Sequence, residues 1–315
     1  MTTQGGSNLN VCAVEGNFDD IQTGVKKIFN NEKMACELDR YGYFLSSANS
    51  INFGRLAPQI VYYFKAYCDM LRDNDTKLGE QINLCVPTGN FGNILAAYIA
   101  KLMGLPISKL ICASNSNNIL TDFLRTGRYD KNRGFNLTIS PSMDILISSN
   151  LERLLYLVAG TERTVQCMKD LSQNGFYEID SDTMSNISND FVGYFASEEQ
   201  TLNTIKQNYS EYGYLMDTHT AVAFSALEQY RKEHGDNTKT VIASTASPYK
   251  FAQAVYGAIY GDNSYGDLEI LEQLSENTNT KIPTPLFELD KKQVNFDSVT
   301  KPNDMYNEVL NFINK

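Results

Sequence analysis

Three short apolar runs constrain the fold of this chain more than any other feature. They are QINLCVP at 81–87, KLICASN at 109–115 and TVIASTA at 240–246, and each has the length and composition of a buried strand. The first and third lead directly into a helical pattern. Strands that alternate with helices form parallel sheets with helices packed on both faces. We therefore predict an α/β fold, a twisted, mostly parallel sheet that helices cover on both faces.

The rest of the chain gives weaker signals. LNVCAVEG at 9–16 is apolar enough for another buried strand, and residues 19–30 and 55–71 have the spacing of amphipathic helices. Residues 150–212 are rich in Leu, Asn, Glu and Tyr and lack a convincing strand, which predicts a helical insertion. The proline-containing tail at 262–315 is expected to end in a surface helix.

The composition describes an acidic chain with enough apolar residues for a large core. The 315 residues are 42% hydrophobic and carry a net charge of −10, which argues against a nucleic-acid groove or an anionic membrane surface as a partner. The N-terminal MTTQGGSNLN lacks the features of a signal peptide, and no apolar run reaches membrane-spanning length. We therefore expect a cytoplasmic protein without nucleic-acid or membrane partners.

Cysteine and histidine give no support to a metal site. The six cysteines are widely spaced, without a CxxC pair, and are expected to be reduced core residues. The only histidines are His219 and His234, too few for a structural zinc or a His-rich catalytic metal. We therefore expect no metal ion in the site of this protein.

The loop TGNFGN at 88–93 stands where the first strand should pass into a helix. Gly89 and Gly92 would let the backbone approach a ligand, while Asn90 and Asn93 would add neutral donors and a helix cap. Backbone N–H groups at such a helix start bind phosphate without a lysine. Because the loop matches neither GxxxxGK[ST] nor GxGxxG, a monophosphate is favoured. The alternative is a tight turn whose glycines serve only geometry.

A second junction of this kind follows the strand at 240–246. In STASPYKF, Ser247 is placed as a helix cap, Pro248 at the first helical position and Thr245 in the turn. A hydroxyl at this strand end could face a ligand that the first loop holds. The alternative is a capped helix without further function.

Seven segments together resemble the threonine synthase family, pyridoxal 5'-phosphate (PLP) enzymes of the tryptophan synthase β, or fold type II, superfamily. The segments are VEGNFDDIQ (14–22), SSANSINFGRLAPQIVYYF (46–64), VPTGNFGN (86–93), GLPISKLICASNSNNIL (104–120), SPSMDILISSNLERLLY (140–156), DTHTAVAF (217–224) and STASPYKF (244–251). They occur in family order over most of residues 1–260. The resemblance implies the last step of threonine biosynthesis, in which a carbon–oxygen lyase acting on phosphates converts O-phospho-L-homoserine and water to L-threonine and phosphate.

The resemblance also implies roles for individual residues. The cofactor phosphate would be held by the backbone of Gly89, Asn90, Phe91, Gly92 and Asn93. Thr245 would hydrogen bond to the pyridine nitrogen, and its neutral hydroxyl would leave that nitrogen largely unprotonated. The substrate phosphate would be held by Ser47, Asn49, Ser50 and Asn52, with Asn150 and Arg153 as second candidates. Arg153 could instead be a solvated helix residue, and His219 is interpreted as a satisfied structural histidine rather than a catalytic group.

The Schiff-base lysine of the family is absent, so no catalytic residue is predicted in this chain. Lys65 and Lys250 have apolar flanks, but neither stands at the family's position. Residues 1–45 would be the C-terminal part of a small inserted α/β domain, and 46–315 the large PLP-binding domain with a helical insertion at about 150–212. We therefore expect the C-terminal portion of a threonine synthase that is inactive alone and that requires the missing N-terminal part as its partner.

Two departures from the family pattern weaken the ligand assignment near the pyridine ring. Ser247 stands where histidine is common, and Thr218 where proline is common. Two other functions remain open. One is a non-catalytic remnant that binds PLP or another phosphate-bearing ligand. The other is a different fold type II lyase, such as a dehydratase or cysteine synthase, which the segment SANSIN and the predicted insertion disfavour.

Overall fold

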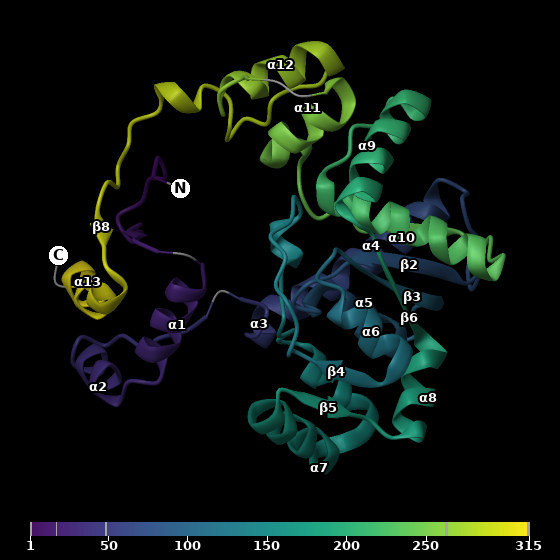
Figure 1. Cartoon of the computed structure of the whole chain (residues 1–315), viewed down its shortest axis with the longest axis horizontal. Helices are drawn as coiled ribbons and strands as arrows, with labels where there is room; N and C mark the ends of the chain where they lie inside the picture. The colour runs from purple at the N-terminus through teal and green to yellow at the C-terminus, as the bar shows by residue number, and fades with distance from the viewer. Residues whose placement is uncertain (1, 17, 48, 262–263, 314–315) are drawn as a thin grey trace. The chain divides into compact units, whose positions relative to one another are not determined.

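The computed structural model describes residues 2–16, 18–47, 49–261 and 264–313. The chain divides into two compact units, which are described separately. The smaller unit is formed by Met1–Ser47 together with Pro283–Lys315, and the larger unit by Ala48–Ile282. The labels of the helices and strands are those of Figure 1.

The larger unit contains a four-stranded parallel sheet. Its strands are β2 (Ile82–Pro87), β3 (Ile107–Ser114), β6 (Phe191–Phe195) and β7 (Thr240–Ile242), in the order β6-β3-β2-β7. The register pairs Cys85 of the central strand β2 with Ile111 on one side and Ile242 on the other. All the pairings in this sheet are parallel. The predicted parallel α/β fold is confirmed.

Helices cover both faces of this sheet (Figure 1). Leu84 and Val86 pack into one apolar cluster with residues of α4, α5 and α6, while Cys85 between them packs into a second cluster with residues of α10. Alternate residues of a strand point to opposite faces of the sheet. This division therefore places α10 on one face and α4, α5 and α6 on the other. The bounds are α4 (Ile60–Arg72), α5 (Gly92–Leu102), α6 (Ile119–Thr126) and α10 (Thr218–His234).

The segment at 150–212 is not the purely helical insertion that the sequence predicts. It contains α7 (Leu151–Asn174), β5 (Phe176–Glu178), α8 (Ser181–Asp190), β6 and α9 (Glu198–Tyr212). β5 pairs antiparallel with β4 (Arg128–Asp130), and β6 pairs parallel with β3 in the main sheet. The expectation of no strand was wrong because β6 starts at the residue after α8, without a turn signal between them. Gly193 allows this strand to lie close to α6, since a Cβ there would be 2.9 Å from Thr121 Cα.

Two predicted strands are shorter and less buried than expected. The run at 9–16 forms only β1 (Ala13–Val14), which pairs with the equally short β8 (Val299–Thr300) and is not buried. The run at 240–246 forms the half-buried β7, and residues 243–247 continue into a loop. Both strands lie at the edge of their described sheets, where one side of the backbone has no neighbouring strand to extend the pairing.

The smaller unit joins the two ends of the chain. Its core contains Ile28, Met34, Leu38 and Met305, and the tail ends in the predicted surface helix, α13 (Met305–Ile313). Residues 283–315 therefore pack with the N-terminal unit, whereas the sequence assigned them to the larger domain. The reason is the β1–β8 pairing and the packing of α13 on α1 (Phe18–Phe29), contacts between segments almost 300 residues apart. The predicted helix at 19–30 is confirmed by α1.

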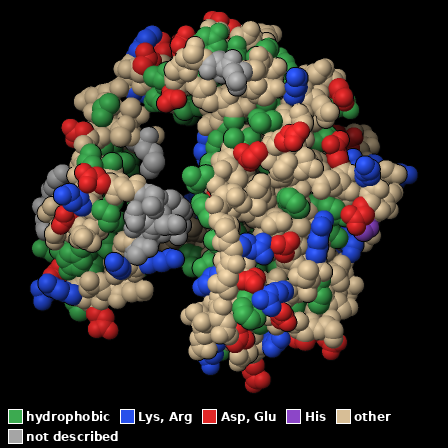
Figure 2. Space-filling view, in the orientation of Figure 1, with side chains coloured by type: hydrophobic (Ala, Val, Ile, Leu, Met, Phe, Trp, Pro, Cys, Tyr) green, Lys and Arg blue, Asp and Glu red, His purple; other side chains and the backbone are tan. Residues whose placement is uncertain are grey.

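Shorter elements complete the described chain. They are α2 (Glu32–Arg40), α3 (Phe53–Leu56), η1 (Ala57–Gln59), η2 (Pro141–Met143), η3 (Pro248–Phe251), α11 (Ala252–Tyr260), α12 (Glu269–Thr278), η4 (Leu289–Lys291) and η5 (Pro302–Asp304). Within the described ranges, every helix is too short or too polar to cross a lipid bilayer. Acidic and basic side chains are interspersed over the face of the larger unit that Figure 2 shows.

The cysteines are not all core residues. Cys85, Cys112 and Cys167 are buried, but Cys36 and Cys68 are exposed on helices, and all six are free thiols. The spacing of cysteines along a sequence does not show whether a cysteine lies on the buried or on the exposed side of an amphipathic helix.

Candidate functional site

The loops that carry the predicted site begin at one end of the parallel sheet. β2 and β7 are neighbours, and Ala243 N–H donates to the carbonyl of Cys85 (2.9 Å), so the loops after these strands start side by side. α10 runs opposite to the strands, because Asp236, just beyond its C-terminus, accepts from Asn83 Nδ2 at the start of β2 (2.8 Å). The N-terminus of α10 therefore lies at the carboxyl edge of the sheet, where open α/β sheets bind their ligands.

The loop 88–93 turns directly from β2 into α5. Thr88 closes the strand by donating from its backbone N–H to Ala113 (2.8 Å) and from its hydroxyl to Val86 (2.7 Å). Phe91 then adopts a left-handed conformation with φ of 60°, and its buried ring packs on Phe191 with 5.7 Å between the ring centres. This packing compensates for a backbone conformation that is unfavourable in a non-glycine residue.

The start of α5 has no side-chain cap among the described residues and no acidic residue in its first turn. The prediction that Asn90 or Asn93 caps this helix was wrong. The Asn93 side-chain oxygen instead accepts from the Tyr63 hydroxyl, and the Asn90 side-chain oxygen from Ser149 Oγ (3.4 Å). With the left-handed Phe91 at the N-cap position, neither amide stands where a cap must stand.

Five successive backbone N–H groups at this helix start have no partner among the described residues. In residues 2–16, 18–47, 49–261 and 264–313, no acceptor pairs with the N–H of Gly89, Asn90, Phe91, Gly92 or Asn93. Such groups carry the positive end of the helix dipole. An anion with several acceptor oxygens is the ligand whose chemistry fits them.

The carbonyl groups of the same loop, in contrast, are firmly held. Asn150 donates to the Asn90 carbonyl from both its side chain (2.8 Å) and its backbone (3.1 Å). Ser148 Oγ donates to the Gly89 carbonyl (2.8 Å). Both donors are buried. The loop is thus fixed with its acceptors used and its donors available.

The two glycines of the loop serve close packing within the protein. A Cβ on Gly89 would be 2.7 Å from the Ser142 carbonyl oxygen, and a Cβ on Gly92 would be 2.7 Å from Ser50 Oγ. The sequence assigned these glycines to the approach of a ligand. The structure shows that they admit neighbouring segments of the chain, which is the geometric role kept open as the alternative, and the approach of a ligand stays a prediction.

The predicted substrate residues fall into two groups. Asn150 donates to Ser50 Oγ (3.0 Å), and Arg153 donates to the Ser50 carbonyl (2.9 Å) and to the side chain of Asn150. Asn49 belongs to the same turn, since its side chain accepts from Ser50 Oγ (3.3 Å). Arg153 is therefore not the solvated helix residue that was the alternative. The structure brings Asn49, Ser50, Asn150 and Arg153 together beside Gly92.

Asn52 and Ser47 are placed differently. The side chain of Asn52 caps α3 by accepting from Gly54 N–H (2.9 Å), so it organises the chain after the turn. Ser47 belongs to the smaller unit, and residue 48, which follows it, lies outside the described residues.

Sequence analysis missed the residues that hold the segment 138–148 against the loop. Asp144 accepts from Asn115 (2.7 Å), Asn117 (2.9 Å) and Thr138 Oγ1 (2.7 Å), which ties the segment to the carboxyl end of β3. The two asparagines directly after a buried strand were a usable signal, because uncharged amides there need partners.

Tyr129 provides a second anchor for this segment. The hydroxyl of this buried residue donates to the Leu146 carbonyl (3.1 Å) and accepts from Ser148 N–H (2.8 Å). Its ring stacks on Tyr177 with 5.3 Å between the ring centres. Burial raises the pKa of Tyr129 well above its ordinary value, so the phenol stays protonated and able to donate.

The junction after β7 is built as predicted. Ser247 Oγ accepts from Tyr249 N–H (3.3 Å), and Pro248 occupies the first position of η3. Thr245 lies exposed in the loop before them. Lys250 is also exposed, with its ammonium 5.3 Å from the Phe251 ring centre. Lys65 is an exposed partner of Asp69 (2.5 Å) on α4, so neither lysine lies in a desolvated environment.

A third cap lies at the start of α10. Asp217, which is buried, accepts from His219 N–H (2.8 Å) and Thr220 N–H (3.2 Å). Burial opposes the charge of this carboxyl, but the hydrogen bonds from His219 and Thr220 hold its pKa below the ordinary value. Asp217 therefore stays ionised next to the His219 ring.

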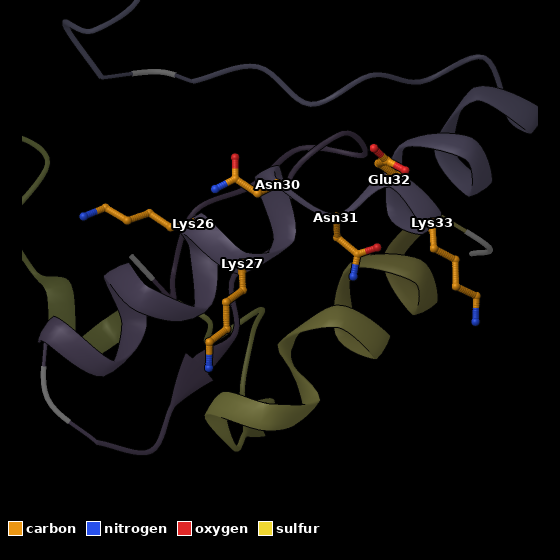
Figure 3. A pocket seen from close by; sticks show the side chains of 6 residues that line it. All are labelled: Lys26, Lys27, Asn30, Asn31, Glu32 and Lys33. Atoms are coloured by element: carbon orange, nitrogen blue, oxygen red, sulfur yellow. The ribbon is translucent and has the colours of Figure 1, made fainter. Parts of the chain in front are cut away.

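A hollow on the smaller unit does not coincide with any predicted residue. Figure 3 shows its lining at the end of α1 and the start of α2: Lys26, Lys27, Asn30, Asn31, Glu32 and Lys33. All except the half-buried Asn31 are exposed, so its charges face solvent, where they are strongly screened. We do not regard it as the ligand site.

Comparison with known proteins agrees with the resemblance. Residues 220–313 match the family described as "Threonine synthase, C-terminal". The chain is 44% identical over 250 residues to human threonine synthase-like 1, covering 78% of this chain and 33% of that protein. PLP-bound threonine synthase from Brucella melitensis superimposes with a TM-score of 0.82 at 35% identity, covering 99% of this chain and 61% of the other. Threonine synthase from yeast superimposes with a TM-score of 0.84 at 33% identity, covering 99% and 60%.

This chain spans between about a third and three fifths of the length of these relatives. The two solved structures each cover 99% of this chain. The chain is accordingly a homologue of the threonine synthases with the fold of a type II PLP enzyme, and its residues 220–313 belong to the threonine synthase C-terminal family.

Proposed function

We propose that this chain is the part of a PLP-dependent lyase that holds the cofactor phosphate and the substrate. The complete enzyme would convert O-phospho-L-homoserine and water to L-threonine and phosphate in the cytoplasm. The observation that carries the proposal is the row of unpaired backbone N–H groups from Gly89 to Asn93 at the uncapped start of α5. The likeness to PLP-bound threonine synthase supports it.

The residues present fit the phosphate of PLP. Five amides at one helix start supply the donors, and the first turn of α5 contains no acidic residue that would repel a dianion. The carbonyl groups of Gly89 and Asn90 accept hydrogen bonds from Ser148 and Asn150, so these carbonyls do not pair with the amides of the loop. The backbone from Gly89 to Asn93 would therefore hold the phosphate without a charged side chain.

PLP, when bound, supplies electron withdrawal from the carbon skeleton of an amino acid. Thr245 is the residue of this chain that would face the pyridine nitrogen, because its loop starts beside the loop after β2. A hydroxyl offers a neutral partner, so it would not favour protonation of that nitrogen as a carboxylate would.

The substrate phosphate would be held beside Gly92. Arg153 is fixed by Ser50 and Asn150, and its guanidinium has five N–H groups, more than these contacts use. Ser50 Oγ lies close to the first residue of α5. Asn49 and Asn52 would position this turn and the chain that follows it.

The lysine that carries the cofactor in this family would come from a part of the protein outside this chain, so the chain alone is proposed to be inactive. A second candidate function is a non-catalytic protein that binds PLP reversibly. The exposure of Lys65 and Lys250, the two lysines with apolar flanks, favours this alternative for the isolated chain.

The phosphate site can be tested with a charge placed in the first turn of α5. Asn93→Asp keeps the shape of the side chain and its contact with Tyr63, but puts a carboxylate beside the unpaired amides. We expect PLP affinity, measured by fluorescence titration, to fall at least about tenfold, while stability is kept because the carboxylate favours the helix dipole. Asn31→Asp makes the same change at the start of α2 in the smaller unit and should leave PLP affinity unaltered. Equal affinity of the two variants would contradict the proposed phosphate site.

The reaction requires the complete reading frame that contains this chain. Release of phosphate from O-phospho-L-homoserine, without ammonia release from serine, is the expected result. Ammonia release from serine would instead indicate a dehydratase. PLP binding with neither reaction would support the non-catalytic alternative.

A further inference from the structure

His219 is a buried histidine with an incomplete set of hydrogen bonds. It is 2% exposed, and its Nε2 atom is inaccessible and has no partner within the described ranges. A buried ring nitrogen without a partner is unfavourable. The expectation that His219 is a satisfied structural histidine is met at Nδ1 but, within the described ranges, not at Nε2.

The other ring nitrogen is well defined. His219 Nδ1 lies 3.5 Å from Asp217 Oδ1 and 3.4 Å from Thr218 Oγ1. Asp217 is ionised and can only accept, so it favours a proton on Nδ1. When the ring is neutral, Nε2 is therefore a hydrogen-bond acceptor, and its partner must be an N–H or O–H donor.

The surroundings of His219 connect it to the loop that carries Thr245. Thr220 Oγ1 donates to Ser244 Oγ (3.2 Å), and the His219 ring lies 4.8 Å from the ring of Phe251. Both partners belong to the junction after β7. The N-terminus of α10 and this junction therefore meet at the carboxyl edge of the sheet, on the side of β7.

We propose that His219 is a positioning residue of the cofactor site, whose Nε2 accepts a hydrogen bond from an N–H or O–H group of bound PLP or of its amino-acid substrate. This inference rests on the proposed function, since it assumes that PLP binds at this edge. Asp217 would keep the proton on Nδ1, and the bound ligand would supply the hydrogen bond that Nε2 lacks.

The two histidines of the chain allow a direct test. In protein labelled with ¹⁵N-histidine, His234→Gln identifies the resonances of His219. Addition of PLP, with binding followed separately by fluorescence, should shift the His219 Nε2 signal if the donor belongs to the cofactor. A shift only after O-phospho-L-homoserine is added would place the donor on the substrate. Inorganic phosphate alone should cause no shift.

Affinity measurements on variants complement the spectra. His219→Ala should weaken PLP binding, or substrate binding to the PLP complex, by about tenfold, the value of one hydrogen bond. His219→Gln offers an amide oxygen as acceptor and should recover part of this loss. His234→Gln, an exposed residue on the same helix, is the matched control and should bind normally.

Two outcomes would overturn the inference, and they differ in what they mean. If PLP and substrate bind while the His219 signal remains unchanged, His219 is not a positioning residue, but the proposed function stands. If the chain binds neither PLP nor phosphate, the proposed site and this inference fail together.

Discussion

Two strand-to-helix junctions at the same edge of the sheet are built in opposite ways. After β7, Ser247 accepts from Tyr249 N–H and Pro248 replaces one donor, so the start of η3 is satisfied by the chain itself. After β2, the left-handed Phe91 takes the cap position, and the amides of Gly89 to Asn93 have no acceptor within the described ranges. A cap satisfies helix amides, whereas a helix start without one leaves them available to a ligand or to water.

The two loops also differ in how the chain holds them. The loop after β2 is held by its carbonyls through Ser148 and Asn150, which keeps its amides directed and unpaired. In the loop after β7, Ser244 and Thr245 are exposed, so the loop can offer the Thr245 hydroxyl without further reorganisation. Changes to the first junction should therefore affect both stability and phosphate binding, and loss of the Ser247 cap should affect mainly stability.

The largest effect is expected from Gly89→Ala. Its Cβ would lie 2.7 Å from a backbone carbonyl oxygen that Asp144 and its partners hold in place, so neither side can move easily. We expect a loss of about 2–3 kcal/mol in the free energy of unfolding, measured by urea denaturation. Gly257→Ala in α11 has open space around the new methyl group and should be neutral or slightly stabilising. Similar losses in both variants would contradict the packing role of Gly89.

Asn150→Ala should have the next largest effect. It removes the side-chain donor to the Asn90 carbonyl and to Ser50, and leaves Arg153 without one of its partners. We expect a loss of about 1–3 kcal/mol and weaker PLP binding, because the buried carbonyl loses a donor and the loop is less well ordered. Asn277→Ala, at an exposed position of helix α12, serves as the control for both measurements.

Ser247→Ala tests the other junction. Loss of the cap should cost about 1 kcal/mol of stability, as measured by thermal unfolding. The affinity for inorganic phosphate should be unchanged, since the amides of η3 are not its ligands. A marked fall in phosphate affinity would show that the two junctions do not divide stability and binding as proposed.

The smallest effect is a pH dependence that originates at Asp217. Because its pKa in the folded protein is below the ordinary value, its ionised form contributes stability that is present above the ordinary carboxyl pKa. That stability is lost as the pH falls through the lowered folded-state pKa. Asp217→Asn should flatten this part of the stability curve between neutral pH and acid. An unchanged curve would exclude Asp217 as the source.

Sequence alone was sufficient for three of the four strands of the parallel sheet, the helices on its two faces and the uncharged loop after β2. These features depend on local patterns: apolar runs of strand length, helical spacing and glycine with asparagine at a strand end. The cap at Ser247 was also readable, because a cap is formed by residues adjacent in the chain. The pairing of Asn150 and Arg153 with Ser50 was not readable, since these residues are about 100 positions apart.

Only the tertiary structure decided the remaining features. β6 follows α8 without a turn signal and is a strand because it pairs with β3. Residues 283–315 pack with the N-terminal unit through pairing with β1, and Asp144 and Tyr129 hold the loop from distant segments. The partnerless Nε2 of His219 depends on what surrounds the ring in space. Local patterns fix the type of each element because they act within a few residues, whereas edge pairing, burial and hydrogen-bond satisfaction depend on contacts that close only when the chain has folded.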